Sequence, residues 1–252
     1  ADPDWHLRVR MRGDPTKLLG ELLPGIHVRG KEWRENGLLK RLVVDTYEPE
    51  VNRYGGPAGM ALAEQVFSAD SRSTLRIIEL LQEKEEPDDR WLLTLLGMDR
   101  LLDDLGYGSD DKLRVAAFLR ENFEVPKASL ADAGRQTIGL KFRELRLRIA
   151  AVLGPEPALP RHLKGVTEIF AERSKAVAPL GVELRRQIGL GRVTQSLEDL
   201  SMAFLHLHAN RMIPFPAVPQ EVVIYDFLHR VCLGRHARSK RDEAHEGRVG
   251  GG

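Results

Sequence analysis

Cysteine is nearly absent from the sequence, with Cys232 the single one among 252 residues. A lone cysteine cannot form an internal disulfide, and such usage is typical of a reducing compartment. No apolar run approaches the roughly 18 to 20 residues that a membrane span requires, and no secretory signal is visible at the start. These absences predict a cytoplasmic chain without a membrane span, in which Cys232 is a packed apolar side chain.

Charge of one sign is also lacking, because the formal net charge is only +1. No direct nucleic-acid binding is therefore expected of the surface as a whole. The sequence contains no Gly-rich phosphate loop and no nucleophile elbow, and the segment 189–191 lacks the third glycine of a dinucleotide loop. What is present is an ordinary globular composition, 42% hydrophobic and 30% charged, which is enough for a sizeable core.

The periodicity of the apolar residues changes along the chain. Residues 6–12 alternate strictly between polar and apolar, which is typical of a half-buried strand, and residues 26–33 and 38–46 predict two further strands. A short helix is expected at 16–23, closed by Pro24. The later helices are expected at about 57–69, 70–85, 91–106, 109–119, 135–152, 161–178, 194–212 and 221–236. The predicted fold class is α+β, with a mixed or antiparallel sheet and a largely helical middle and C-terminal part packed around it.

One domain is expected over residues 1–236, followed by a disordered, charged and Gly-rich tail over residues 237–252. The chain opens without methionine and reaches a strand-like segment within a few residues. We therefore expect upstream sequence to be missing, including the first strands of the domain.

The opening segment predicts a two-faced strand, because residues i, i+2 and i+4 of a strand share a face. One face would carry His6, Arg8, Arg10 and Arg12, and the other would bury Leu7, Val9 and Met11. The arginine face is either a solvated sheet surface or an anion-binding floor. Arginine suits the second role because its planar fork binds a carboxylate through two hydrogen bonds.

A second candidate segment, residues 47–56, joins a predicted strand to a predicted helix and ends in Arg53, Tyr54 and two glycines. Loops held by a rigid scaffold often carry function, and paired glycines let the backbone approach a ligand closely. An ordinary turn with a tyrosine packed beneath it explains the same residues.

A third candidate segment is the predicted helix that contains His206 and His208. Helical geometry places His206 beside Asn210 on one flank and His208 on the other. Arg211 falls near the centre of the apolar stripe, so its guanidinium needs a partner. A zinc site at the two histidines would lack a second ligand cluster, and no metal is expected.

Together these segments resemble the elimination domain of the class I lanthipeptide and thiopeptide dehydratases. The resemblance rests on the opening segment 2–10, the acidic-then-Arg-Tyr-Gly-Gly signature of residues 47–56, the following segment 63–71 and the histidine-containing helix 205–211. The order of these segments matches the family over residues 1 to about 236. The large glutamylation domain of full-length dehydratases is not in this sequence.

The resemblance implies a lyase of antibiotic biosynthesis. A separate enzyme that depends on glutamyl-tRNA esterifies Ser or Thr of a ribosomal precursor peptide, which carries a leader and a core. The elimination domain then removes glutamate and leaves dehydroalanine or dehydrobutyrine, without a cofactor. By resemblance, His206, Arg8, Arg10 and Arg53 are catalytic. The substrate-binding residues would be His6, Tyr54, Asn210 and Arg211. We expect His206 to face a cavity that also holds Arg8 and Arg10, and His208 to point elsewhere.

Two other functions remain open from the sequence. Some stand-alone members of the family are pyridine synthases, which join two dehydroalanines by a formal [4+2] cycloaddition and expel the leader peptide. A degenerate domain that only binds precursor peptide is the third hypothesis. The retained arginines and His206 favour elimination, because a cycloaddition has no glutamate to bind.

Overall fold

The computed structural model describes residues 6–82, 89–122, 132–154, 158–214 and 217–249. Within these ranges every regular element is helical, so the protein is all-α and the predicted α+β class is wrong. The chain divides into two compact units, Ala1–Pro49 and Glu50–Gly252.

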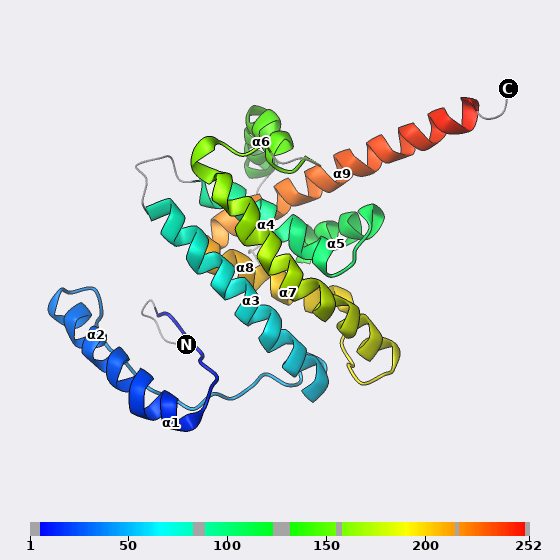
Figure 1. Cartoon of the computed structure of the whole chain (residues 1–252). Coiled ribbons are helices and arrows are strands. Elements are labelled where there is room, and N and C mark those ends of the chain that lie inside the picture. The colour runs from blue at the N-terminus through cyan, green and yellow to red at the C-terminus, as the bar shows by residue number, and fades with distance from the viewer. Residues whose placement is uncertain (1–5, 83–88, 123–131, 155–157, 215–216, 250–252) are drawn as a thin grey trace. The chain divides into compact units, whose positions relative to one another are not determined.

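The first unit contains a continuous helical run. It consists of α1 (Pro15–Lys17), a π-helical turn η1 (Leu18–Leu22) and α2 (Leu23–Glu35) (Figure 1). Asp14 begins the run, since its carboxylate accepts a hydrogen bond from the Lys17 amide at 3.1 Å. The strand expected at 26–33 is therefore wrong. Pro24 does not end the helix, because the helical run continues through it from the π-helical turn η1 into α2.

The strands expected at 6–12 and 38–46 are also wrong, because neither segment has regular secondary structure or belongs to a sheet. The side chains expected in the core point outward, with exposed fractions of 88% for Leu7, 62% for Val9 and 49% for Met11. Alternation shows only which side chains would share a face of a strand. A strand also needs a neighbouring strand to bond its backbone groups, and none of the described residues provides one.

The second unit is a bundle of long helices. Its elements are α3 (Pro57–Gln82), α4 (Arg90–Asp104), α5 (Ser109–Asn122), α6 (Asp132–Val152), η2 (Arg161–Leu163), α7 (Lys164–Gly189), α8 (Leu197–Met212) and α9 (Ala217–Val249). The helices expected from the sequence are present here with two main differences. The segment 57–82 is one helix instead of two, and α7 extends past Pro179 to Gly189.

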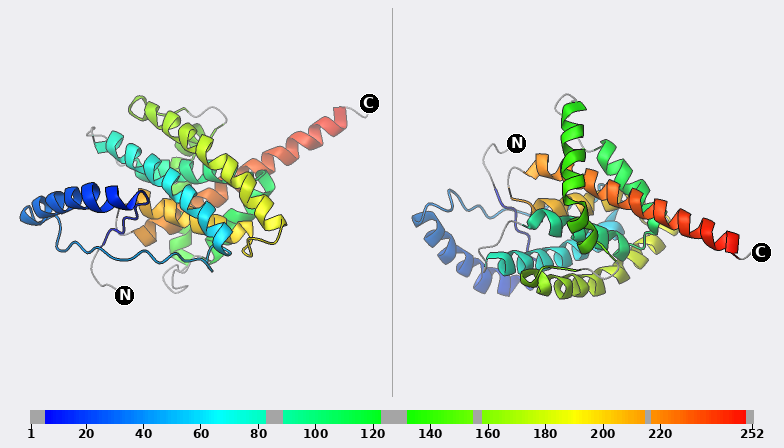
Figure 2. Two further views of the ribbon diagram at one scale, coloured as in Figure 1. Left: turned by 60° about the horizontal axis from the view of Figure 1, so that its bottom comes forward. Right: turned by 90° about the horizontal axis from the view of Figure 1, so that it is seen from above.

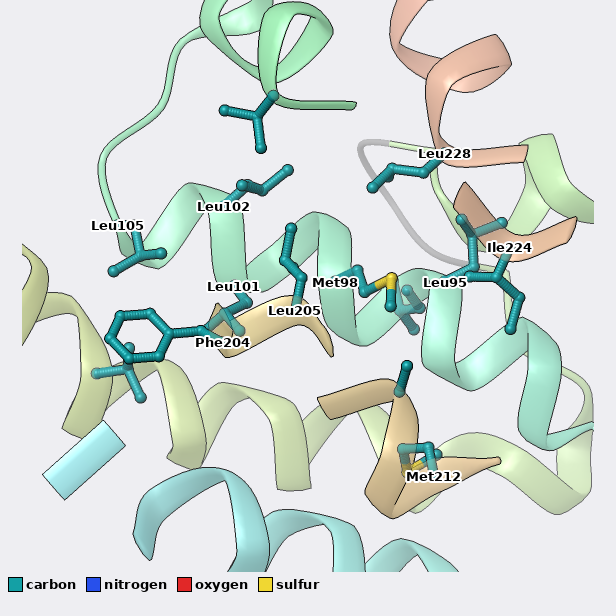
Figure 3. Close-up of a cluster of buried hydrophobic side chains, with 14 of the residues drawn as sticks. Leu95, Met98, Leu101, Leu102, Leu105, Phe204, Leu205, Met212, Ile224 and Leu228 are labelled. Atoms are coloured by element: carbon teal, nitrogen blue, oxygen red, sulfur yellow. The ribbon is translucent and has the colours of Figure 1, made fainter. Parts of the chain in front are cut away.

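The core of this unit surrounds α4, whose residues are buried on almost every side. A helix that is buried on most sides must be covered by several neighbours, and α7, α8 and α9 pack against α4. Helices α3 and α7 run side by side (Figures 1 and 2). In the close-up, leucines and Met98 of α4 lie against Phe204 and Leu205 of α8 and against Ile224 and Leu228 of α9 (Figure 3). This packing fixes the rotation of α8, which carries both candidate histidines.

Helix α9 extends beyond the body of the second unit (Figure 2). It continues to Val249, through most of the segment for which the sequence predicts a disordered tail. The tail is rich in residues of good helix propensity, so a helix can persist there without apolar periodicity. The bounds 1–236 and 237–252 for domain and tail stay a prediction. No helix in the described ranges is long and apolar enough to cross a bilayer.

Candidate functional site

Helix α8 begins at a well-defined cap and passes through the core. The Ser196 hydroxyl accepts a hydrogen bond from the Asp199 amide at 3.0 Å, which satisfies a backbone donor of the first turn. Phe204 and Leu205 are buried further along the helix. The two histidines that follow point to different environments, as expected from the helical geometry.

His206 lies at the boundary between core and solvent, with 35% of its side chain exposed. Its Nδ1 atom is 2.7 Å from Oε1 of Glu221 on α9, and its Nε2 atom is 2.9 Å from Nδ2 of Asn210. The predicted neighbours His206 and Asn210 are thus brought together. Glu221 is fully buried, and the hydroxyl of Tyr225 donates a hydrogen bond to the same Oε1.

His208 is fully buried and belongs to a different cluster. Its Nδ1 atom lies 2.8 Å from Oδ1 of Asp70 on α3. The same carboxylate accepts hydrogen bonds from Arg173 of α7 and Arg211 of α8, both at 3.0 Å. Arg173 also donates to the Gly97 carbonyl oxygen at 2.7 Å. We call Asp70, Arg173, His208 and Arg211 the Asp70 cluster.

The electrostatics of the Asp70 cluster favour the ionised carboxylate. Burial alone would raise the pKa of Asp70, but the charge and hydrogen bond of His208 and the charges of both arginines outweigh it. The pKa is therefore held well below its usual range. Arg211 has the acidic partner that its position on the apolar stripe requires, which confirms that expectation. Its role as a substrate-binding residue stays a prediction.

The segment 50–56 packs against α8 through aromatic rings. Tyr54 is buried, and its ring stacks on that of Phe204 with 6.4 Å between the centroids. The ring of Phe67 packs against that of Tyr54 in an edge-to-face arrangement, with 5.3 Å between the centroids. The Arg53 guanidinium lies 5.9 Å from the Tyr54 ring centroid, and its Nη1 atom is 3.2 Å from a carboxylate oxygen of Glu50. Arg53 therefore stays at the surface above a rigid aromatic base.

Gly55 fixes the course of this segment. Its φ is +76°, and its carbonyl oxygen accepts a hydrogen bond from the Thr194 amide at 3.0 Å. A Cβ atom at this position would lie 2.8 Å from the Gln195 amide nitrogen, so only glycine fits without displacement. Gly55 thus allows the loop to pack closely against the backbone that precedes α8. Arg53 remains the candidate functional side chain of this loop.

The remaining predicted residues, His6, Arg8 and Arg10, belong to the first unit. All three are exposed, and the Arg10 guanidinium lies 5.3 Å from the Tyr47 ring centroid. The sheet floor expected for an anion is not formed by the described residues of this unit. That Arg8 and Arg10 converge on the site of His206 stays a prediction.

The sequence analysis did not single out Glu221, although a signal was available. Glu221 shares one face of α9 with Ile224, Tyr225 and Leu228, all of which are buried. A carboxylate on the apolar face of a helix needs a partner, and this pattern could have been noticed without a structure.

Two smaller expectations concern cysteine and metal ligands. Cys232 is buried, and burial raises the pKa of its thiol to about 12, so the thiol is a packed side chain as expected. In the described part of the chain, no three His, Cys, Asp or Glu side chains gather as a metal ion would need.

The chain belongs to the family described as lantibiotic biosynthesis dehydratase C-term, which it matches over residues 1–232. The resemblance inferred from the four sequence segments is confirmed. Subtilin biosynthesis protein SpaB of Bacillus subtilis is 30% identical over 121 residues, 48% of this chain and 11% of that protein. Nisin biosynthesis protein NisB of Lactococcus lactis subsp. lactis is 30% identical over 84 residues, 33% of this chain and 8% of that protein. The aligned segments thus span about a tenth of these relatives. No solved structure matches the chain.

Proposed function

We propose that this protein removes glutamate from glutamylated Ser or Thr residues of a ribosomal precursor peptide, with His206 as the base. The observation that carries the proposal is the His206–Glu221 pair. His206 is partly exposed and has a buried carboxylate behind its Nδ1 atom. This arrangement suits a proton acceptor, because the carboxylate stabilises the imidazolium that forms.

The proposed step is a β-elimination. Nε2 of His206 takes the Cα proton of the glutamylated residue, and the C–H electron pair becomes the Cα–Cβ double bond. The Cβ–O bond breaks, and glutamate leaves with that electron pair as a carboxylate. No cofactor is required, since esterification has already converted the hydroxyl into a leaving group.

Arginine would supply the positive charge for this step. The Arg53 side chain is about half exposed, and a bound carboxylate could replace Glu50 as its partner. Arg8 and Arg10 are proposed to bind the second carboxylate of the glutamyl group and to stabilise the enolate-like charge on the peptide carbonyl. A separate glutamyl-tRNA-dependent enzyme would deliver the substrate.

The test uses a glutamylated precursor peptide and reads its mass after incubation with the full chain. The wild type should release glutamate and leave dehydro residues. H206A, R8A, R10A and R53A should leave glutamyl adducts in place. R76A is the matched arginine control. In the part of the chain that the structure describes, Arg76 makes a surface ion pair with Glu172, so this variant should process the peptide normally.

The competing cycloaddition gives a different product. A second reaction supplies a peptide that already carries dehydroalanines. If the wild type leaves glutamyl adducts untouched but converts this second peptide into a pyridine macrocycle without its leader, the proposal is wrong and the protein is a pyridine synthase.

A further inference from the structure

Glu221 is placed unusually for a carboxylate. It lies on the buried face of α9 with no exposed surface, and among the described residues no cation pairs with it except His206. Its Oε1 atom forms hydrogen bonds with both the His206 ring and the Tyr225 hydroxyl. Its buried Oε2 atom has no hydrogen-bond partner in the described chain. A half-satisfied buried carboxylate destabilises a fold, so packing alone does not explain it.

The hydrogen bonds around Glu221 select one tautomer of His206. An ionised carboxylate only accepts, so the shared proton must sit on Nδ1 of the histidine. Burial, followed by the nearby Glu221 charge, raises the pKa of Tyr225 well above its usual value, so this hydroxyl keeps its proton and donates it. Nε2 of His206 then carries the lone pair, and the Asn210 amide donates to it. All three contacts agree with the Nδ1–H form.

We propose that Glu221 is the positioning residue of His206, which holds the ring in the Nδ1–H tautomer and stabilises it once Nε2 has accepted a proton. This role rests on the proposed elimination. Glu221 lies behind the ring and does not touch the substrate. Asn210, which is exposed, covers Nε2 in this structure and must release it when the peptide binds.

The first experiment measures kcat and KM for elimination with E221Q in the full chain. The amide has nearly the shape of the carboxylate but no charge, and it can donate to the ring and so favour the other tautomer. We expect kcat to fall by about 10²- to 10⁴-fold with KM within about twofold, since a wrong tautomer impairs the chemical step. E221D should recover part of the rate because it restores the charge. D226N is the matched control, since Asp226 pairs with Arg230 one turn further along α9 and should retain the wild-type kcat.

The second experiment detects the tautomer without any substrate. In protein labelled with ¹⁵N-histidine, the two ring nitrogens of His206 have different chemical shifts, and H206Q identifies the signals. We expect a protonated Nδ1 and an unprotonated Nε2 in the wild type, and loss of this preference in E221Q. Should E221Q not fold, the wild-type spectrum still decides whether Nδ1 carries the proton.

The outcomes separate this inference from the proposed function. An Nε2-protonated His206 in the wild type, or an E221Q variant that folds with wild-type kcat, overturns the role of Glu221. If H206A eliminates glutamate as fast as the wild type, the proposed function fails, whatever the spectrum shows. If the wild type eliminates no glutamate but shows the Nδ1–H form that E221Q loses, the elimination is wrong and the tautomer assignment stands.

Discussion

Two histidines, two positions apart on α8, have the same kind of partner at Nδ1 but differ in burial and in the groups around that partner. Each ring presents Nδ1 to a buried carboxylate, at 2.7 Å for His206 and Glu221 and at 2.8 Å for His208 and Asp70. The Asp70 carboxylate also binds two arginines, whereas the second partner of Glu221 within the described ranges is the Tyr225 hydroxyl. His208 is fully enclosed, and His206 keeps a third of its side chain exposed.

The difference teaches that a carboxylate–histidine pair has no fixed role. The Asp70 cluster carries two arginines for one carboxylate, and that buried carboxylate joins α3, α7 and α8. The Glu221 pair joins α8 to α9, is exposed on the His206 side and has no arginine partner among the described residues. We therefore assign a structural role to His208 and a chemical role to His206.

The largest expected effect separates these roles. H206A should reduce elimination by about 10²- to 10⁴-fold, the usual contribution of a general base. It should lower the free energy of unfolding by only about 1 to 2 kcal/mol, since water can reach the vacated position. H208A should do the reverse and lose about 2 to 4 kcal/mol of stability through its cavity, with elimination by the folded protein within tenfold of wild type. Urea unfolding and peptide mass spectrometry measure the two effects. Equal loss of activity in both variants would contradict the assignment.

The second prediction compares the two carboxylates. D70N should destabilise the protein by about 3 to 5 kcal/mol, because it removes the hydrogen-bonded counter-charge of the fully buried Arg173 and leaves that guanidinium only Asp104, at 3.8 Å, among the described residues. E221Q should change the free energy of unfolding by about 1 kcal/mol or less, because it leaves no described arginine without its acidic partner. Chemical denaturation of both variants at neutral pH makes the comparison. A D70N variant as stable as E221Q would show that the Asp70 cluster contributes little.

The third prediction concerns acid. Since the folded-state pKa of Asp70 is depressed, its contribution is present above the unfolded-state pKa of about 3.9 and is lost as pH falls toward the folded value. Below about pH 5, wild-type stability should therefore fall more steeply than that of D70N. Other carboxylates titrate in both proteins, and the difference between the two curves cancels them. Parallel curves from pH 5 to pH 2 would be incompatible with an ionised Asp70.

The smallest effect tests how tightly His208 is enclosed. A Cβ atom at Gly97 would lie 2.2 Å from Nε2 of His208, so G97A should cost about 1 to 3 kcal/mol despite alanine's better helix propensity. G234A in α9 meets no atom within 4 Å and should stabilise the protein by up to about 1 kcal/mol. Thermal unfolding compares the two variants. A stabilised G97A would mean that the ring can move aside.

The sequence predicted the second unit well and the first unit poorly. Helices such as α4, α5 and α8 follow from their apolar spacing, and α8 also from its Ser196 cap, which are local properties. The strand predicted at 6–12 failed because pairing depends on neighbours that alternation does not specify. The prediction of two helices at 57–85 failed because Asp70, where the second helix was expected to begin, is buried inside α3 by partners far along the chain.

The candidate site was predicted in the same uneven way. Family resemblance identified His206 and Asn210, and the structure brings them into contact. The pairing of Asp70 with His208 and of Glu221 with His206 became visible only when α3 and α9 were packed on α8. Periodicity can orient a side chain on its own helix, but it cannot say what the facing helix presents.

The Asp70 cluster also has a consequence for the order of folding. Its contacts join residues 103, 138 and 141 positions apart, and closing such loops is entropically unfavourable early in folding. The cluster should form after the transition state, when the neighbouring helices are already docked. Substitutions in the cluster should then leave the folding rate nearly unchanged and accelerate unfolding. The Asp70 carboxylate would thus determine the unfolding rate, and with it the lifetime of the folded second unit.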